Sequence, residues 1–319
     1  MPIHGDIQSL PRNKGEDGFP PSKNNFVAVQ LAEAWFADHQ QRGEMEYAAA
    51  MPERPYRASF ASKRCARALQ YAMAKVPESE PVTIASAWTM GLGNMVHDRL
   101  QDVVTNLFPD AEAEPTVDLS TIGINGSGHA DLVMSHNGER VLVELKTTGG
   151  FSFKMMASSF KGKPEGPRFG YLVQAAILAA ALGIDKIVIA LLSLEPLSPQ
   201  LAEAYSDSEA GRFAAKWHYT LDELMPFVEA EVARVKRVED AIEQGVLVRR
   251  RLDDPEYPAG AEVIDPSASR APWQVMGADG SIVDTGAYWG CAYCPWRSRC
   301  SQDGTSETYT FTSYERNEE

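Results

Sequence analysis

Two short apolar runs joined by an Asn-Gly pair constrain the fold of this chain more than any other part of its sequence. The runs cover residues 132–134 and 141–145, and Asn137-Gly138 between them is a dipeptide that favours positive φ. The segment is therefore predicted to form a β-hairpin. Because side chains alternate along a strand, Glu144 and Lys146 should point to one face of the second strand.

The hairpin also brings a second acidic residue to that face, since Asp131 opens its first strand. Two carboxylates and a lysine at one strand end are costly unless a cation lies between the acids. Asp131 and Glu144, with the backbone carbonyl of Leu145, offer the oxygen ligands that a hard divalent cation prefers. Lys146 could then orient water or neutralise charge during phosphodiester hydrolysis. The alternative is a solvated strand edge, where Glu-x-Lys alternation is common.

Two predicted helices carry further polar residues. Apolar positions over residues 89–104 suit an amphipathic helix with His97 near its start. Residues 171–182 form a strongly apolar helix that ends at Gly183, and Gln174 is its polar exception. Either residue has a plain alternative, His97 as a structural or solvent-facing histidine and Gln174 as a surface or capped amide.

The chain has four cysteines, which are Cys65 and the C-terminal group Cys291, Cys294 and Cys300. Four thiols suit a tetrahedral zinc or a cubane iron–sulfur cluster. The first residues are polar and lack the apolar segment of a secretory signal, so we expect a cytoplasmic protein. Disulfides are rare in that compartment, which favours a metal centre over unrelated free thiols.

Composition narrows the function further. The formal net charge of −14 argues against a nonspecific nucleic-acid binder. It leaves a nuclease open, because a local groove can be basic on an acidic protein, with Lys154 in a predicted loop among the candidate contributors. The hydrophobic content of 44 % is enough for a sizeable core. No stretch approaches the ~20 apolar residues of a membrane span.

Taken in chain order, the motifs resemble the CRISPR-associated, RecB-like exonucleases of the PD-(D/E)XK superfamily, which also resemble the nuclease domain of AddB. The resemblance spans Ser62 to Cys300. Its elements, in order, are an N-terminal cysteine, a Gly-x-x-x-His helix, an aspartate, Glu-x-Lys, a helical glutamine and Cys-x2-Cys-x5-Cys. In this chain the matching residues are, in the same order, Cys65, Gly93 with His97, Asp131, Glu144 with Lys146, Gln174, and Cys291, Cys294 and Cys300.

The resemblance implies a role for each matched position. His97, Asp131 and Glu144 would hold Mn²⁺ or Mg²⁺, Lys146 would be catalytic, and Gln174 would position the substrate or the lysine. A [4Fe–4S] cluster would be bound by the four cysteines, Cys65, Cys291, Cys294 and Cys300, and would staple the two ends of the domain together.

One position departs from the family pattern. The family's helix usually runs Gln-x-x-x-Tyr, but Leu178 stands where the tyrosine would be. Tyr171, nearly one turn before Gln174, is a candidate substitute.

The predicted fold is α/β, with a PD-(D/E)XK core of a mixed sheet flanked by helices and a helical and C-terminal iron–sulfur subdomain. A capping box at Thr220 and Glu223 should open a long helix. The expected organisation is an N-terminal arm (1–55), a helical region (56–110), the nuclease core (111–200), a C-terminal helix and cluster region (201–300) and a mobile tail (301–319).

The function predicted from these features is a metal-dependent DNA exonuclease that prefers single-stranded DNA, CRISPR-associated or phage-encoded. The strand preference and the exonucleolytic mode come from the resemblance, which also allows a homo-oligomer because ring-forming relatives exist. One alternative is a catalytically weak subunit that holds DNA ends or a partner integrase or helicase. Another is a zinc-stapled structural protein with a degenerate site.

Overall fold

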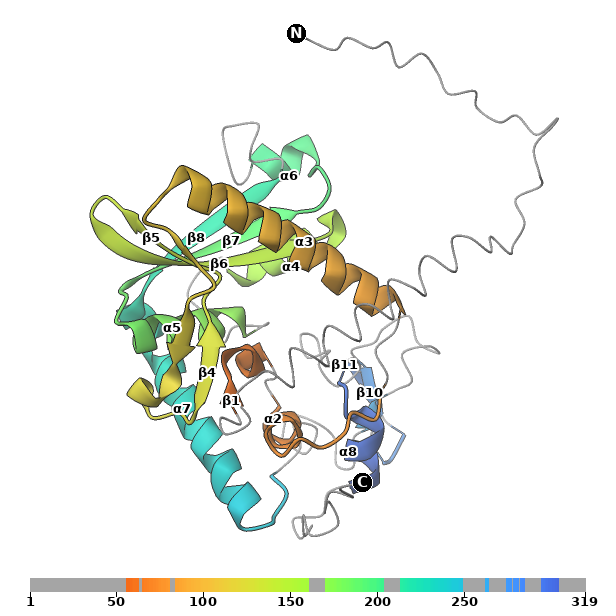
Figure 1. Ribbon diagram of the computed structural model, residues 1–319. Helices are drawn as coiled ribbons and strands as arrows, with labels where there is room; N and C mark the ends of the chain where they lie inside the picture. The colour runs from red at the N-terminus through yellow and green to blue at the C-terminus, as the bar shows by residue number, and fades with distance from the viewer. Residues whose placement is uncertain are drawn as a thin grey trace, which may run out of the picture.

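A five-stranded mixed sheet with helices packed around it forms the centre of the molecule, which confirms the α/β class (Figure 1). The computed structural model describes residues 56–62, 65–80, 84–160, 170–203, 213–248, 262–263, 274–276, 278–280, 282–284 and 294–303. The predicted arm at 1–55, Cys291 and all but the first three residues of the predicted tail lie outside these segments.

The main sheet has the strand order β2-β5-β6-β7-β8. Its strands are β2 (Glu112–Ala113), β5 (Leu132–His136), β6 (Glu139–Thr148), β7 (Lys186–Ser193) and β8 (Ala214–Thr220). Strands β6 and β7 are parallel, and the other neighbouring pairs are antiparallel. A parallel pair needs a crossover, and the chain between β6 and β7 includes α4 (Gly150–Ser159) and α5 (Tyr171–Leu182).

The predicted hairpin is confirmed in β5 and β6. Asn137 and Gly138 have φ of 54° and 83°, and they join strands whose last pair is His136 with Glu139. A two-residue loop with both φ values positive matches the right-handed twist of the strands. This turn sets the register, which places Leu132 opposite Val143 and so brings the start of β5 close to Glu144.

Smaller sheets and further helices surround the main sheet. A second sheet has the order β1-β4-β3 and a third has the order β11-β10-β9. The remaining elements are β1 (Tyr56–Arg57), η1 (Ala58–Ser62), α2 (Ala66–Met73), α3 (Ile84–Leu107), β3 (Thr116–Asp118), η2 (Leu119–Ile122), β4 (Gly126–His129), α6 (Pro199–Glu203), α7 (Leu221–Glu243), β9 (Glu262–Val263), β10 (Gln274–Met276), β11 (Ile282–Asp284) and α8 (Arg297–Asp303).

Two local predictions were wrong. Helix α3 begins at Ile84, so His97 lies in its middle and not near its start. Gly91 and Gly93 weaken the helical pattern in the sequence, but packing against the sheet overrides their low propensity. A Cβ on Gly93 would lie 3.1 Å from the Thr147 hydroxyl oxygen, so this glycine lets α3 approach β6 closely. Lys154 lies within α4 and not in a loop.

The main core packs α5 against the sheet and against α7. Leu172, Val173 and the run 175–179 on α5 are all fully buried. Leu178 lies beside Gly128, where a Cβ would come within 2.8 Å of the leucine Cδ2. The same Cβ would lie 2.5 Å from the Ala58 Cβ, so glycine at this position lets β4 pack closely against η1 as well as α5. This packing fixes the backbone just before Asp131.

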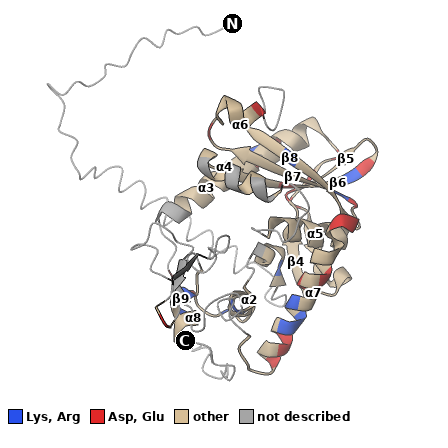
Figure 2. Ribbon diagram, turned by 180° about the vertical axis from the view of Figure 1, so that it is seen from behind, with Lys and Arg blue, Asp and Glu red and all other residues tan. Residues whose placement is uncertain are grey.

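The predicted capping box is present at the start of α7. The backbone N–H of Thr220 donates to the Glu223 carboxylate at 2.7 Å, and the Thr220 hydroxyl accepts from the Glu223 backbone N–H at 3.4 Å. Along α7 the acidic residues lie toward both ends and the basic residues lie between them (Figure 2). In the part of the chain that the structure describes, no helix is long and apolar enough to cross a membrane.

A second, smaller core joins segments that are far apart in sequence. It consists of Ala68, Tyr71, Ala72, Val76, Leu247 and Trp296. We refer to residues 65–80 and 294–303, which pack together here, as the clasp. The Trp296 indole N–H donates to the Val76 carbonyl at 2.9 Å, across 220 positions of sequence. The backbone N–H groups of Ser79 and Glu80 both donate to the Pro295 carbonyl.

Candidate active site

The hairpin places Asp131 directly beside the second strand. Its carboxylate Oδ2 accepts a hydrogen bond from the Leu145 backbone N–H at 2.7 Å and lies 3.6 Å from the Lys146 Nζ. The aspartate side chain keeps 16 % of its surface exposed. Asp131 is therefore held by the strand and remains reachable from solvent.

Glu144 has the most unusual environment of the predicted residues, because its side chain is fully buried. Its Oε1 accepts from the Lys146 Nζ at 2.5 Å. Its Oε2 has no hydrogen-bond partner, and no other buried side-chain oxygen or nitrogen in the described segments lacks one. Burial raises the pKa of Glu144 to about 7; the Lys146 charge opposes this rise and the Asp131 charge adds to it.

Lys146 lies between the two acids. Its Nζ also donates to the Leu145 carbonyl at 3.0 Å and lies 5.1 Å from the centre of the Tyr171 ring. Burial acts to lower the pKa of Lys146, but the charges of Glu144 and Asp131 outweigh it and raise the pKa to about 12. The side chain is therefore an ammonium ion at neutral pH and is not suited to accept a proton.

Helix α3 approaches the site from the other side of Asp131. The His97 Nδ1 lies 3.9 Å from the Asp131 Oδ1, and the histidine side chain is 20 % exposed. One turn later, Gln101 donates from Nε2 to the Asp131 backbone carbonyl at 3.1 Å. Gln101 was not among the residues predicted from the sequence, although it follows His97 by four residues and therefore lies on the same face of the helix.

Helix α5 contributes the residues on the remaining side. Tyr171, which the sequence offered as a candidate substrate-facing residue, contacts Lys146 through its ring. Burial raises the pKa of the Tyr171 hydroxyl, Lys146 lowers it and Glu144 raises it, with a net rise. Gln174 is half-buried and lies three residues further on, so it shares the Tyr171 face of the helix.

Lys146 therefore lies within reach of both Asp131 and Glu144, and His97 approaches Asp131 from helix α3. In the segments described above, no three His, Cys, Asp or Glu side chains are grouped so that they could hold a metal ion. The ammonium of Lys146 stands instead between the two acids and also occupies the Leu145 carbonyl. Lys146 thus supplies the positive charge between the two carboxylates, and the buried Glu144 Oε2 is left without a hydrogen-bond partner.

Three of the four cysteines lie at the clasp, although among the described residues they do not form a group that could hold a metal ion. Cys65, Cys294 and Cys300 are half-buried and pack against its small core, while Cys291 lies outside the described residues. The Cys300 backbone N–H donates to the Trp296 carbonyl at 2.8 Å, and Cys65 directly precedes α2. The fold thus brings thiols from the two ends of the described chain to one apolar patch.

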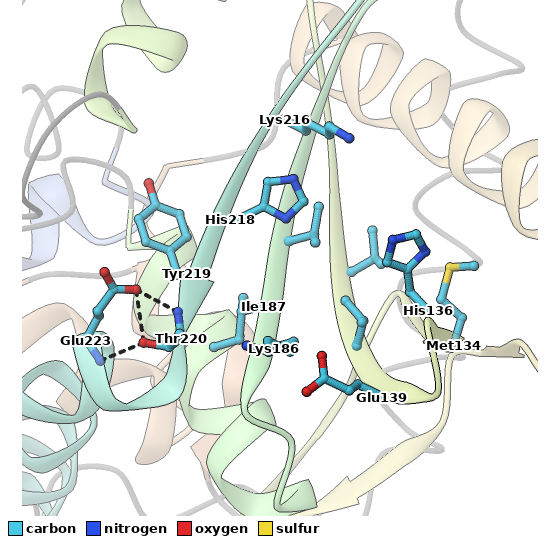
Figure 3. A pocket seen from close by; sticks show the side chains of 13 residues that line it. Met134, His136, Glu139, Lys186, Ile187, Lys216, His218, Tyr219, Thr220 and Glu223 are labelled. Carbon is cyan, nitrogen blue, oxygen red and sulfur yellow. Dashed lines mark hydrogen bonds between the residues drawn. The ribbon is translucent and has the colours of Figure 1, made fainter.

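A separate hollow of about 420 Å³ lies on the main sheet, over strands β5 to β8 (Figure 3). Its polar lining mixes both charges and consists of His136, Glu139, Lys186, Lys216, His218, Thr220 and Glu223. None of the residues predicted to be functional lines it. The hollow and the Asp131 site are therefore different places on the sheet.

No protein-family model matches the chain, and a comparison with curated proteins finds no match. Among solved structures, SSO0001 is similar at 20 % identity and a TM-score of 0.42, over 69 % of this chain and 88 % of that one. An alkaline exonuclease, LHK-Exo from Laribacter hongkongensis, is similar at 15 % identity and a TM-score of 0.42, over 63 % of this chain and 95 % of that one. The same enzyme in complex with dAMP is similar at 15 % identity and a TM-score of 0.39, over 66 % of this chain and 95 % of that one. At these scores the function must be argued from the site itself.

Proposed function

We propose that this protein is a divalent-cation-dependent deoxyribonuclease that acts at Asp131, Glu144 and Lys146. The observation that carries the proposal is the Glu144 carboxylate, which is fully buried with one oxygen lacking any hydrogen-bond partner. A carboxylate in such a position is costly, and proteins retain such groups chiefly at functional sites. The neighbouring Asp131 carboxylate completes a pair that a cation would stabilise.

The residues would divide the chemistry as follows. Asp131, Glu144, the Leu145 carbonyl and His97 would hold Mn²⁺ or Mg²⁺, which when bound lowers the pKa of water and neutralises phosphate charge. Lys146, as an ammonium ion, would stabilise the negative charge that develops on the phosphate in the transition state. The Tyr171 ring would limit the directions in which this ammonium points.

The finer features of the substrate belong to the same proposal. The exposed part of Asp131 and the half-buried Gln174 would face the DNA, and Gln174 would position the substrate or Lys146. Preference for single strands, digestion from an end, and a role beside an integrase or helicase follow from the family resemblance. The acidic character of the chain favours a local contact with DNA over broad electrostatic attraction.

Digestion of end-labelled single-stranded DNA tests the proposal. Wild type should cleave with Mn²⁺ and lose cleavage in EDTA, whereas Lys146→Ala should cleave at least a hundredfold more slowly. Lys186→Ala is the matched control, since Lys186 is an exposed lysine on the neighbouring strand β7. Equal cleavage by wild type and Lys146→Ala would remove the role assigned to Lys146. Wild type that binds DNA in EDTA and never cuts it would be a binding subunit.

We further propose that Cys65, Cys291, Cys294 and Cys300 hold a [4Fe–4S] cluster. Support comes from the half-buried thiols of Cys65, Cys294 and Cys300, which pack against one apolar core as a shielded cluster requires. Anaerobically purified protein should contain about four iron atoms per chain and absorb visible light, and Cys294→Ser should lose both properties. A colourless preparation containing one zinc per chain would identify a zinc site instead.

A further inference from the structure

Gln101 is a buried polar residue that the chemistry described so far does not use. Its side chain is 6 % exposed, and its amide Nε2 donates to two acceptors at once. One is the Asp131 backbone carbonyl at 3.1 Å, and the other is the Glu114 Oε1 at 3.4 Å. A buried amide costs free energy unless it is hydrogen-bonded, so these contacts define where this side chain can lie.

The place of Gln101 on α3 makes it part of a continuous contact with the site. Gly93, His97 and Gln101 are four residues apart and therefore line one face of the helix. Gly93 faces Thr147 on β6, His97 faces the Asp131 carboxylate, and Gln101 binds the Asp131 main chain. The helix thus contacts both the side chain and the backbone of a single residue.

Glu114, the second hydrogen-bond partner of Gln101, also binds the Asp131 backbone carbonyl. The Glu114 backbone N–H donates to the Asp131 carbonyl at 3.2 Å. Glu114 has φ of 49°, in the left-handed region that is unfavourable for a residue other than glycine. Gln101 contacts this side chain as well as the carbonyl, so it joins the turn and the aspartate into one unit.

We propose that Gln101 is a positioning residue that fixes the Asp131 backbone, and through it the distance of the Asp131 carboxylate from Glu144. The inference rests on the proposed function, because the distance between the two acids matters for holding a cation. Groups that orient ligands without touching the metal typically change metal affinity by about 10- to 100-fold. Loss of the amide donor should therefore weaken cation binding without removing any ligand.

Calorimetric titration with Mn²⁺ in the absence of DNA tests the inference, with Gln101→Met compared to wild type. Methionine keeps the length of the side chain and removes its donors. Gln70→Met is a matched control, because Gln70 is also a buried glutamine with two hydrogen bonds, to Val246 and from Val248 at the clasp. We expect Gln101→Met to weaken Mn²⁺ binding about tenfold, and Gln70→Met to lower the melting temperature with Mn²⁺ affinity unchanged.

The outcomes separate the inference from the proposed function. Wild-type Mn²⁺ affinity in Gln101→Met would overturn the inference alone, whereas wild type that binds no Mn²⁺ would overturn both. Should Gln101→Met fold poorly, Gln101→Leu also removes the donors without adding a charge, and the same loss of affinity is expected. In cleavage assays, Gln101→Met should need about ten times more Mn²⁺ for half-maximal rate and approach the wild-type rate at saturation.

Discussion

Replacing Glu144 by glutamine should stabilise the metal-free protein and abolish its activity. In the native state burial raises the pKa of this carboxyl from 4.5 to about 7. Between these values the unfolded chain releases its proton first, so the native state loses stability as pH rises through this window. Above pH 7 the loss reaches about 3 kcal/mol, since each pKa unit corresponds to ~1.4 kcal/mol.

Glutamine resembles the protonated carboxyl and is neutral at every pH. In EDTA at pH 8, Glu144→Gln should therefore be more stable than wild type by about 3 kcal/mol, which is on the order of 5–10 °C in melting temperature. At pH 4.5 and below, the two proteins should melt at nearly the same temperature. Glu139→Gln, at an exposed position on the same strand, is the control and should shift stability by less than about 0.5 kcal/mol.

Thermal denaturation across pH, with and without Mn²⁺, measures these effects. With Mn²⁺ at a hundred times its dissociation constant, wild type should gain about 2.7 kcal/mol. The variant should gain much less, because a neutral amide is a poor ligand for a hard cation. Wild type that is as stable as Glu144→Gln in EDTA at pH 8 would refute the view that a buried charge destabilises this site.

Two further substitutions test contacts at the site and at the clasp. Tyr171→Leu removes the ring that lies 5.1 Å from the Lys146 Nζ. Such a contact is worth about 0.5–2 kcal/mol, so kcat should fall about 2- to 30-fold. Tyr171→Phe keeps the ring, so its kcat should stay near that of wild type. Loss of activity in both variants would assign the role to the hydroxyl. Trp296→Phe leaves the buried Val76 carbonyl without its donor and should lower the free energy of unfolding by about 1–3 kcal/mol in urea denaturation; unchanged stability would show that this hydrogen bond contributes nothing.

The parts of the site that the sequence predicts are those set by local rules. Asn137-Gly138 predicts the turn, and alternation along β6 then puts Glu144 and Lys146 on one face. The sequence shows that Tyr171 lies about one helical turn before Gln174. It does not show that α5 packs so that the Tyr171 ring contacts Lys146. Gln101 was missed because a glutamine on an amphipathic helix usually faces solvent, and only its tertiary contacts with Asp131 and Glu114 reveal that it is buried.

The elements that the sequence did not predict depend on long-range packing. Gly91 and Gly93 lower the helix propensity of this segment, so the sequence pattern places the start of α3 too late. In the folded protein, packing against the sheet stabilises the helix through these glycines. Helix α4 has short apolar runs broken by serines and glycines, so neither helical nor strand periodicity dominates its sequence. The placement of Cys65 near Cys294 and Cys300 at one small core was expected only from the family resemblance, since no local pattern in the sequence indicates it.

The clasp has a consequence for how the chain reaches its native state during synthesis. Helix α2 and the residues after it leave the ribosome early, yet their partner Trp296 is made more than 200 residues later. Until then Tyr71 and Val76, both nearly fully buried in the native state, lack the indole that covers them. The main core can form before this point, because its residues lie within positions 56–248. Closure of the clasp is therefore a late event, and chains released before Trp296 should retain a folded sheet while exposing an apolar surface around α2.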